Sequence, residues 1–188
     1  SCDTYFYRLS EKMGIKRMNK WLEAFGYGQK TGIDLPNESP GLVPTPSWKY
    51  STYGKGWYKG ETLITGIGQG YLLVTPLQLA YSTALIANHG KGVQLHLVKG
   101  NELPLEVSVP VDEKNWQAVI KAMNEVVSQP SGTAFRISHG LTYTMSGKTG
   151  TAQVFTLEEE KDTPTQESLA KHLRDHSLFV GFAPSENP

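Results

Sequence analysis

Residues 146–152 combine side chains that could bind and activate a carbonyl substrate. The ammonium of Lys148 stands next to the hydroxyls of Thr149 and Thr151, and two glycines in the segment remove side chains. A substrate can therefore approach the backbone closely. If the segment is a strand, an extended peptide can pair with its edge while one N–H stabilises an oxyanion. The segment predicts a strand that docks an extended substrate, with Lys148 supplying positive charge for an anionic group of that substrate.

The position of this strand follows from the pattern around it. Alternation places Thr149 and Thr151 on one face and Lys148 on the other, toward the helices. A β pattern covers 142–155 and returns at 176–183, with a polar segment at 156–171 between them. We expect the two runs to pair as antiparallel neighbours, with the polar segment looping out. A Gly-rich turn with a solvated lysine is the simpler alternative, because Lys-Thr-Gly alone is a weak signal.

Three further patterns favour ordinary structural interpretations. Ser168 and Lys171 form the one S-x-x-K match in the sequence, which we interpret as a chance match in a polar loop. His172 and His176 could ligate a metal if they lay on one helix. We favour a surface pair of histidines, because His176 is expected to begin a strand. Residues 66–70 place the third glycine too early for a dinucleotide fingerprint and indicate a turn that precedes a helix.

Helical periodicity predicts the elements that must position these residues. Helices are expected over 3–14, 15–25, 75–90 and 113–128, the last of which should bury Trp116, Val119, Ile120, Met123 and Val127. Residues 26–60 are rich in proline and aromatic side chains and predict a long ordered loop or lid. Short strands are expected at 93–98 and 105–109. Helices followed by a late pair of strands predict an α+β fold with both late strands in one antiparallel sheet.

Composition excludes several classes of protein. The 188 residues suffice for one domain or most of one. Eighteen basic residues balance eighteen acidic ones, which argues against a nucleic-acid partner held by a basic field. No run of apolar residues is long enough to span a membrane, and the single cysteine, Cys2, permits no internal disulfide.

Several motifs follow one another in an order that is more specific than any of them alone. They are SCDTYFY at 1–7, FGYG at 25–28, TGIDL at 31–35, GIGQG at 66–70, TPLQ at 75–78, KTGTAQVF at 148–155 and LRDH at 173–176. This ordered set closely resembles the transpeptidase domain of the class B penicillin-binding proteins that act in cell-wall elongation. The resemblance covers essentially all 188 residues.

The resemblance implies a penicillin-binding/β-lactamase-like transpeptidase fold, with helices packed on an antiparallel sheet. It implies that residues 1–188 are part of one transpeptidase domain, from the S-x-D triad through the K-T-G strand and the next strand. The S-x-x-K nucleophile of the family precedes its second triad, and none stands there in this sequence. We therefore expect an incomplete fragment, without the nucleophile and the C-terminal elements, that is inactive alone.

The resemblance also implies an activity and a set of site residues. The intact enzyme would be a penicillin-sensitive D,D-transpeptidase that cross-links peptidoglycan stem peptides by a serine acyl-enzyme mechanism. Catalytic roles fall on Ser1, Asp3 and Lys148, and substrate contacts on Thr149, Gly150 and Thr151. No cofactor is required, although Cys2 resembles a position that can help bind a structural zinc whose other ligands lie outside the chain.

The expected partners are stem peptides, β-lactam antibiotics and membrane proteins of the elongation complex, with no nucleic acid. The expected location is the bacterial inner membrane, with the domain facing the periplasm. Two alternatives stay open. One is a β-lactamase, although no glutamate here has the E-x-x-L-N context that fast deacylation needs. The other is a non-catalytic module that senses β-lactams or binds an assembly partner.

Overall fold

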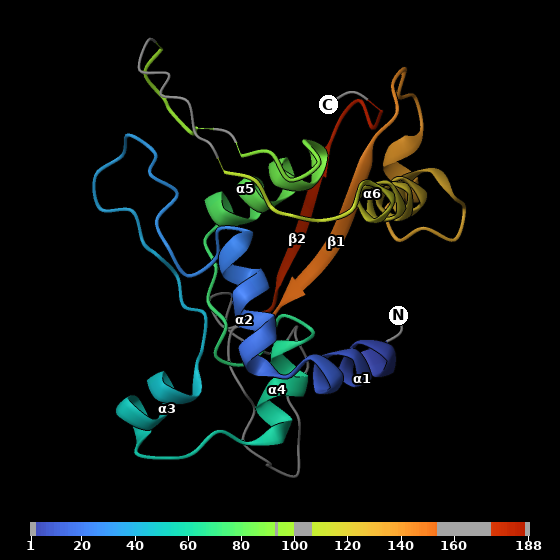
Figure 1. Ribbon diagram of the computed structural model, residues 1–188. Coiled ribbons are helices and arrows are strands. Elements are labelled where there is room, and N and C mark those ends of the chain that lie inside the picture. Colours follow the sequence, from blue (N-terminus) through green and yellow to red (C-terminus); the bar gives the residue numbers. More distant parts are fainter. Residues whose placement is uncertain (1–2, 93, 100–106, 154–173, 187–188) are drawn as a thin grey trace.

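The computed structural model describes residues 3–92, 94–99, 107–153 and 174–186. Helices make up most of the regular secondary structure, and two antiparallel strands follow them in the sequence (Figure 1). The elements are α1 (Asp3–Met13), α2 (Ile15–Ala24), α3 (Pro46–Tyr53), α4 (Lys59–Thr65), α5 (Pro76–Ala87), α6 (Glu113–Ser128), the 3-10 helix η1 (Phe135–Ser138), β1 (Ser146–Ala152) and β2 (His176–Phe182).

The two predicted late strands do pair as antiparallel neighbours, in a register that joins Ser146 to Phe182 and Ala152 to His176. Helix α6 packs against β1, and helix α5 packs against β2 (Figure 1). The predicted α+β fold, with helices on an antiparallel sheet, is confirmed. The strands are shorter than the predicted runs, and the expected excursion at 156–171 lies outside the described residues.

The hydrophobic core joins α2, α5 and α6. Tyr81, Leu85, Val109 and Trp116 are buried together, and the Phe25 ring packs edge-on against the indole of Trp116. On α6 the buried stripe runs through Trp116, Met123 and Val127, as helical spacing predicts. The expectation for Val119 is wrong, because that side chain falls beside the stripe and is 45% exposed.

The region at 26–60, predicted to be a long ordered loop or lid, contains helix α3, and helix α4 begins at its end. Helix α3 begins with Thr45 as N-cap, whose Oγ1 accepts from the Trp48 N–H at 3.0 Å. This Thr-Pro start is the same signal that predicts α5 at Thr75. Helix α4 is joined to α3 by an ion pair between buried Lys49 and Glu61.

The two short strands expected at 93–98 and 105–109 are wrong for the residues that the structure describes. There, residues 94–99 form no strand, and Ser108 makes a single antiparallel bridge to Lys91. The backbone N–H groups of residues 97 and 98 donate to the carboxylate of Asp34, at 2.6 and 3.0 Å, and not to a partner strand. These two hydrogen bonds lower the pKa of Asp34.

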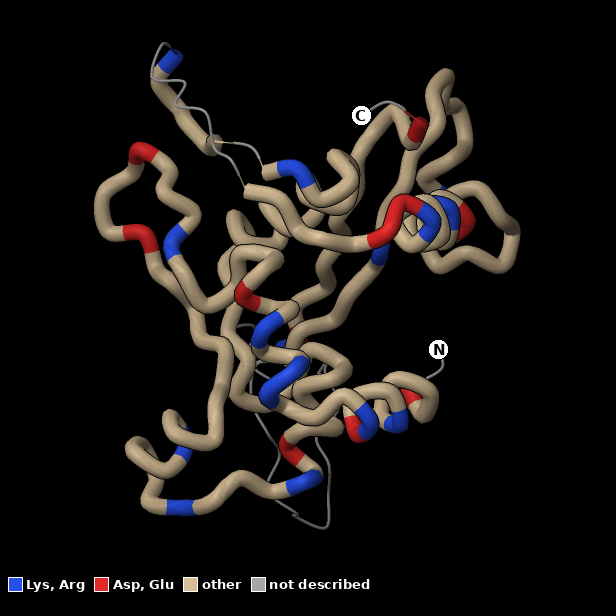
Figure 2. Tube along the Cα trace, viewed as in Figure 1, with Lys and Arg blue, Asp and Glu red and all other residues tan. Residues whose placement is uncertain are grey.

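Charged side chains are distributed over the described surface. Lys and Arg gather along α2, whereas Asp and Glu are interspersed with them on α1 and α6 (Figure 2). In the described ranges, no helix is both long and apolar enough to cross a bilayer.

Helix α1 leaves much of its apolar stripe uncovered. Tyr5, Phe6 and Leu9 are 59%, 47% and 38% exposed, and the one buried side chain of this helix is Ser10. Exposed apolar surface and an unpaired strand edge both promote association. We expect the 188-residue chain to self-associate, with a weight-average mass in sedimentation that rises with concentration. A Phe6→Lys, Leu9→Lys variant should shift that curve toward the monomer, and a monomeric wild type at high concentration would contradict the prediction.

Candidate active site

The first residue of β1 is fixed to the rest of the molecule by buried hydrogen bonds. The Oγ of Ser146, which is fully buried, donates to the Ile120 carbonyl of α6 at 3.3 Å and contacts the Oγ of Ser185 at 2.9 Å. The Nδ2 of Asn124 donates to the Met145 carbonyl at 3.0 Å and to the Ser185 hydroxyl at 3.2 Å. Helix α6 and the segment after β2 therefore hold the start of the strand that carries Lys148.

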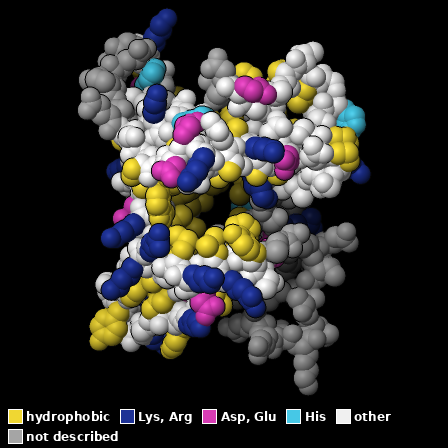
Figure 3. All heavy atoms as spheres, turned by 45° about the vertical axis from the view of Figure 1, so that its right-hand side comes forward, with side chains coloured by type: hydrophobic (Ala, Val, Ile, Leu, Met, Phe, Trp, Pro, Cys, Tyr) yellow, Lys and Arg dark blue, Asp and Glu magenta, His cyan; other side chains and the backbone are white. Residues whose placement is uncertain are grey.

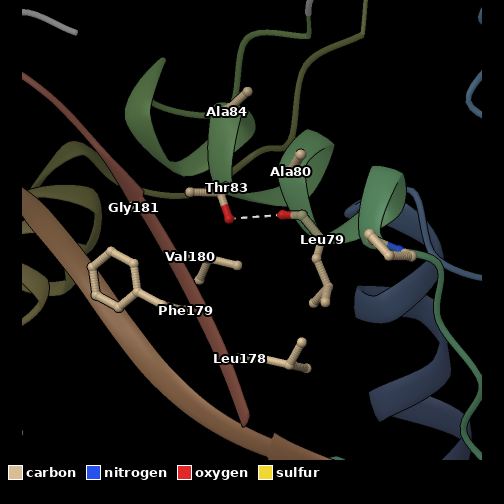
Figure 4. Close-up of a pocket in the computed structure, with 9 residues that line it drawn as sticks. Leu79, Ala80, Thr83, Ala84, Leu178, Phe179, Val180 and Gly181 are labelled. Atoms are coloured by element: carbon tan, nitrogen blue, oxygen red, sulfur yellow. Dashed lines mark hydrogen bonds between the residues drawn. The ribbon is translucent and has the colours of Figure 1, made fainter. Parts of the chain in front are cut away.

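The register assigns the faces of the sheet. Lys148 pairs with Val180 and Gly150 with Leu178, so these four residues share one face. Leu178 and Val180 point toward α5, and Phe179 points away from it and over β1 (Figure 4). Lys148 therefore lies on the helix-facing side of the sheet. Thr149 and Thr151 lie on the opposite side, as strand alternation predicts.

The two glycines of β1 have different reasons for lacking a side chain. A Cβ on Gly147 would lie 2.4 Å from the ring of Phe179, which reaches across from β2 and also lies close to Gly181 on its own strand. Gly147 is thus required for packing inside the sheet and does not serve substrate approach, contrary to the sequence interpretation. A Cβ on Gly150 would meet only the Cβ of Leu178, at 3.7 Å. Gly150 therefore keeps the backbone accessible.

Lys148 and Thr149 form hydrogen bonds along β1. The Nζ of Lys148 donates to the Thr149 carbonyl at 2.7 Å, which places the ammonium beside the strand backbone. The Thr149 hydroxyl contacts the hydroxyl of Thr133, in the turn after α6, at 2.8 Å. The ammonium and the Thr149 hydroxyl thus belong to neighbouring residues of β1 and extend from opposite faces of the strand, and both groups can contribute to binding a carboxylate.

The outer edge of β1, meaning the edge away from β2, is contacted by Gln69 from the turn between α4 and α5. Its Nε2 donates to the Thr151 carbonyl at 2.9 Å, and its Oε1 accepts from the Gln153 N–H at 3.4 Å. In an antiparallel pair, alternate residues direct both backbone groups to the same edge. The Thr151 N–H therefore points to the outer edge as well, where an oxyanion donor has to point.

A large apolar cavity of about 600 Å³ adjoins this end of β1. Trp21, Leu22 and Phe25 of the α2 region line it together with Gly150 and Thr151. Figure 3 shows hydrophobic side chains around a hollow on one face of the molecule. Tyr27, also in the lining, contacts the Ser82 hydroxyl at 2.6 Å, and burial raises the pKa of its phenol. The phenol therefore stays neutral at physiological pH.

The predicted second triad is described only at Asp3, the first residue of α1; Ser1 and Cys2 lie outside the described residues. Helix α1 packs against α4 and α2, whereas β1 packs against β2 and α6. The predicted proximity of Ser1 and Asp3 to Lys148 stays a prediction. Over the described ranges, no three His, Cys, Asp or Glu side chains form a group that could hold a metal. The zinc hypothesis concerns Cys2 and also stays a prediction.

Three residues of this region were missed by sequence reasoning: Gln69, Thr133 and Ser185. Gln69 stands inside the GIGQG motif, which the sequence analysis interpreted as a turn before a helix. The predicted turn is present. The one sequence feature that could have indicated its contact with β1 is the amide side chain of Gln69 between two glycines. Thr133 and Ser185 carry no local signal, because their partners are 16 and 39 residues away.

The fold and the β1 strand can now be compared with those of known protein families. The model of the penicillin binding protein transpeptidase domain matches residues 1–188. The chain therefore belongs to the penicillin-binding protein transpeptidase family, which confirms the resemblance derived from its motifs.

Within the family, the chain is similar to peptidoglycan D,D-transpeptidases named MrdA and to PBP2 structures. It is 44% identical to the peptidoglycan D,D-transpeptidase MrdA of Acinetobacter baumannii, over all of this chain and 29% of that protein. The structure of Pseudomonas aeruginosa PBP2 in complex with WCK 5153 matches 99% of the chain, with a TM-score of 0.84 and 42% identity, over 40% of its own length. The Helicobacter pylori complex between PBP2 and MreC matches 99%, with a TM-score of 0.85 and 38% identity, over 32% of the matched chain. The chain thus spans about a third of the length of such relatives.

Proposed function

We propose that residues 1–188 form part of the transpeptidase domain of a serine D,D-transpeptidase that cross-links peptidoglycan stem peptides during elongation. The observation that carries the proposal is the exposed outer edge of β1. That edge carries the Lys148 ammonium beside the Thr149 carbonyl and the Thr151 N–H next to an accessible Gly150, and the Thr149 hydroxyl extends from the neighbouring face. Membership of the family and similarity to MrdA proteins support the same activity.

The chemistry that we propose is an acyl transfer. A serine outside these 188 residues attacks the carbonyl of the D-Ala-D-Ala bond, and its proton passes to the neighbouring lysine. The C–N bond then breaks, Ser1 relays a proton to the leaving D-alanine amine, and an acyl-enzyme remains. The amine of a second stem peptide attacks that ester, forms the cross-link and releases the serine.

The residues of this chain have separate roles in that proposal. The Thr151 N–H donates to the oxyanion, and the Thr149 and Thr151 hydroxyls bind the terminal carboxylate. Lys148 stabilises negative charge in the site and keeps the proton network in place. Asp3 orients the second triad by hydrogen bonding. None of these steps uses a metal or a cofactor.

Partners and location extend the same proposal. We propose that β-lactams acylate the intact enzyme, since their strained carbonyl would occupy the position of the D-Ala-D-Ala carbonyl. The Helicobacter pylori PBP2 was solved with MreC, which supports membrane proteins of the elongation complex as partners of this protein too. We place the intact enzyme at the inner membrane, with this domain in the periplasm.

Labelling with a fluorescent penicillin tests the function. The full-length transpeptidase that contains this chain should acquire one covalent label, on a serine upstream of residue 1. The 188-residue chain should acquire none, because Ser168 in its sole S-x-x-K match follows the K-T-G strand. Intact-mass and peptide mass spectrometry locate the adduct. A full-length protein without label, or a stable adduct on Ser1 or Ser168, would contradict the proposal.

A further inference from the structure

The contact between Gln69 and β1 has the geometry of strand pairing. A carbonyl at one residue and the N–H two residues later lie on the same edge of a strand. The Gln69 amide accepts from the Gln153 N–H and donates to the Thr151 carbonyl, as a peptide group of a neighbouring strand would. Its side chain therefore replaces one residue of a partner strand at the outer edge of β1.

The turn that carries Gln69 is shaped to present this side chain. Gly68 and Gly70, on either side of it, have φ values of +76° and +77°, in the left-handed region that favours glycine. The Gln69 N–H donates back to the Ile64 carbonyl at 3.1 Å, which ties the turn to the end of α4. A Cβ on Gly70 would lie 3.2 Å from the Ile64 side chain, so the turn has little freedom to rearrange.

We propose that Gln69 is a positioning residue of the transpeptidase site. It fixes the direction of the Thr151 backbone groups at the outer edge of β1 and sets the register in which a ligand docks on this strand. This inference rests on the proposed function. The Thr151 carbonyl and the Gln153 N–H are already bonded to Gln69, and the Thr149 carbonyl accepts from Lys148. An extended ligand on this edge is therefore left with the N–H groups of Thr149 and Thr151.

This arrangement has a consequence for catalysis. The N–H and the carbonyl of Thr151 lie on the same edge, so holding the carbonyl also restricts the direction of the N–H. An oxyanion donor contributes most when it is already oriented before the reaction. Gln69 does not touch the reacting atoms in this proposal, and it acts through the Thr151 backbone.

The test is acylation kinetics in the full-length transpeptidase. Gln69→Ala should lower the first-order acylation constant k2 by about tenfold per active enzyme, the effect of one well-placed hydrogen bond. The dissociation constant of the non-covalent penicillin complex should change less than twofold, and the melting temperature should stay close to that of the wild type. A purely structural role would lower the melting temperature and the active fraction and leave k2 unchanged.

Two variants make the result specific. Gln69→Glu keeps the size and the acceptor for Gln153 but cannot donate to the Thr151 carbonyl when ionised, so k2 should fall in this variant as well. Gln117→Ala removes an exposed glutamine amide on α6 and should leave k2 unchanged. A wild type that is not acylated would contradict the proposed function. A wild type that is acylated, with both Gln69 variants within twofold of its k2, would overturn this inference alone.

Discussion

Lys148→Ala in the full-length transpeptidase is expected to lower the rate of acylation by penicillin about a thousandfold, at the upper end for loss of one stabilising group in an active site. The Nζ of Lys148 donates to the Thr149 carbonyl, so the ammonium lies at the strand proposed to bind the acyl donor. Alanine removes the positive charge that would stabilise the developing oxyanion and the substrate carboxylate. Stopped-flow acylation with a chromogenic or fluorescent β-lactam measures the effect.

Two companion variants separate charge from geometry. Lys148→Arg keeps the positive charge but presents a planar guanidinium, so it should recover only part of the rate. Lys121→Ala removes an exposed lysine from α6 and should leave the rate unchanged. Circular dichroism should be the same for all three variants, because Lys148 is exposed. An alanine variant that is acylated within threefold of the wild type would remove Lys148 from the mechanism.

Gln78→Ala is expected to lower the free energy of unfolding of the chain by about 3 kcal/mol, the sum of a lost helix cap and lost buried hydrogen bonds. Gln78 has no exposed surface. Its Nε2 donates to the carbonyls of Gln29 and Pro40, both at 2.8 Å, and its Oε1 accepts from the Thr75 N–H at 3.0 Å. One amide thus caps α5 and holds two distant turns against it.

Urea unfolding followed by tryptophan fluorescence measures this loss. Gln78→Glu is nearly the same size, but its carboxylate would face the two carbonyls that the amide now binds, so it should cost at least as much as alanine. Gln117→Ala should change stability by less than about 0.5 kcal/mol, as exposed substitutions usually do. A Gln78→Ala variant as stable as this control would show that solvent replaces the three hydrogen bonds at no cost.

The sequence predicted an element correctly where the signal was a local cap or an apolar repeat with the spacing of a helix or a strand. The Thr75-Pro76 cap located α5, and the apolar spacing located α2 and α6. The K-T-G motif identified β1 and the face of Lys148, because alternation in a strand fixes the faces once the strand is known. The pairing of β1 with β2 followed from two β patterns with one polar segment between them.

The failures have two different causes. Helix α3 was missed because the proline and aromatic content of its region outweighed its Thr-Pro cap, which lacks the N3 glutamine of the α5 capping box. The strands expected near Leu95 failed because the Asp34 carboxylate satisfies the backbone N–H groups of residues 97 and 98. Gly147 was assigned to substrate approach, although its neighbour is the Phe179 ring. The last two errors concern contacts made across the fold, which local pattern does not encode.

The pairing of β1 with β2 has a consequence for the order of folding. Ser146 pairs with Phe182 and Ala152 with His176, so the strands must close a long loop before any ladder hydrogen bond forms. The helices and their caps depend on neighbours three or four residues away and can form much earlier. The strand that carries Lys148 is therefore expected to become ordered after helices α5 and α6 have formed. During refolding, protection of amide hydrogens in β1 should lag behind that in α5.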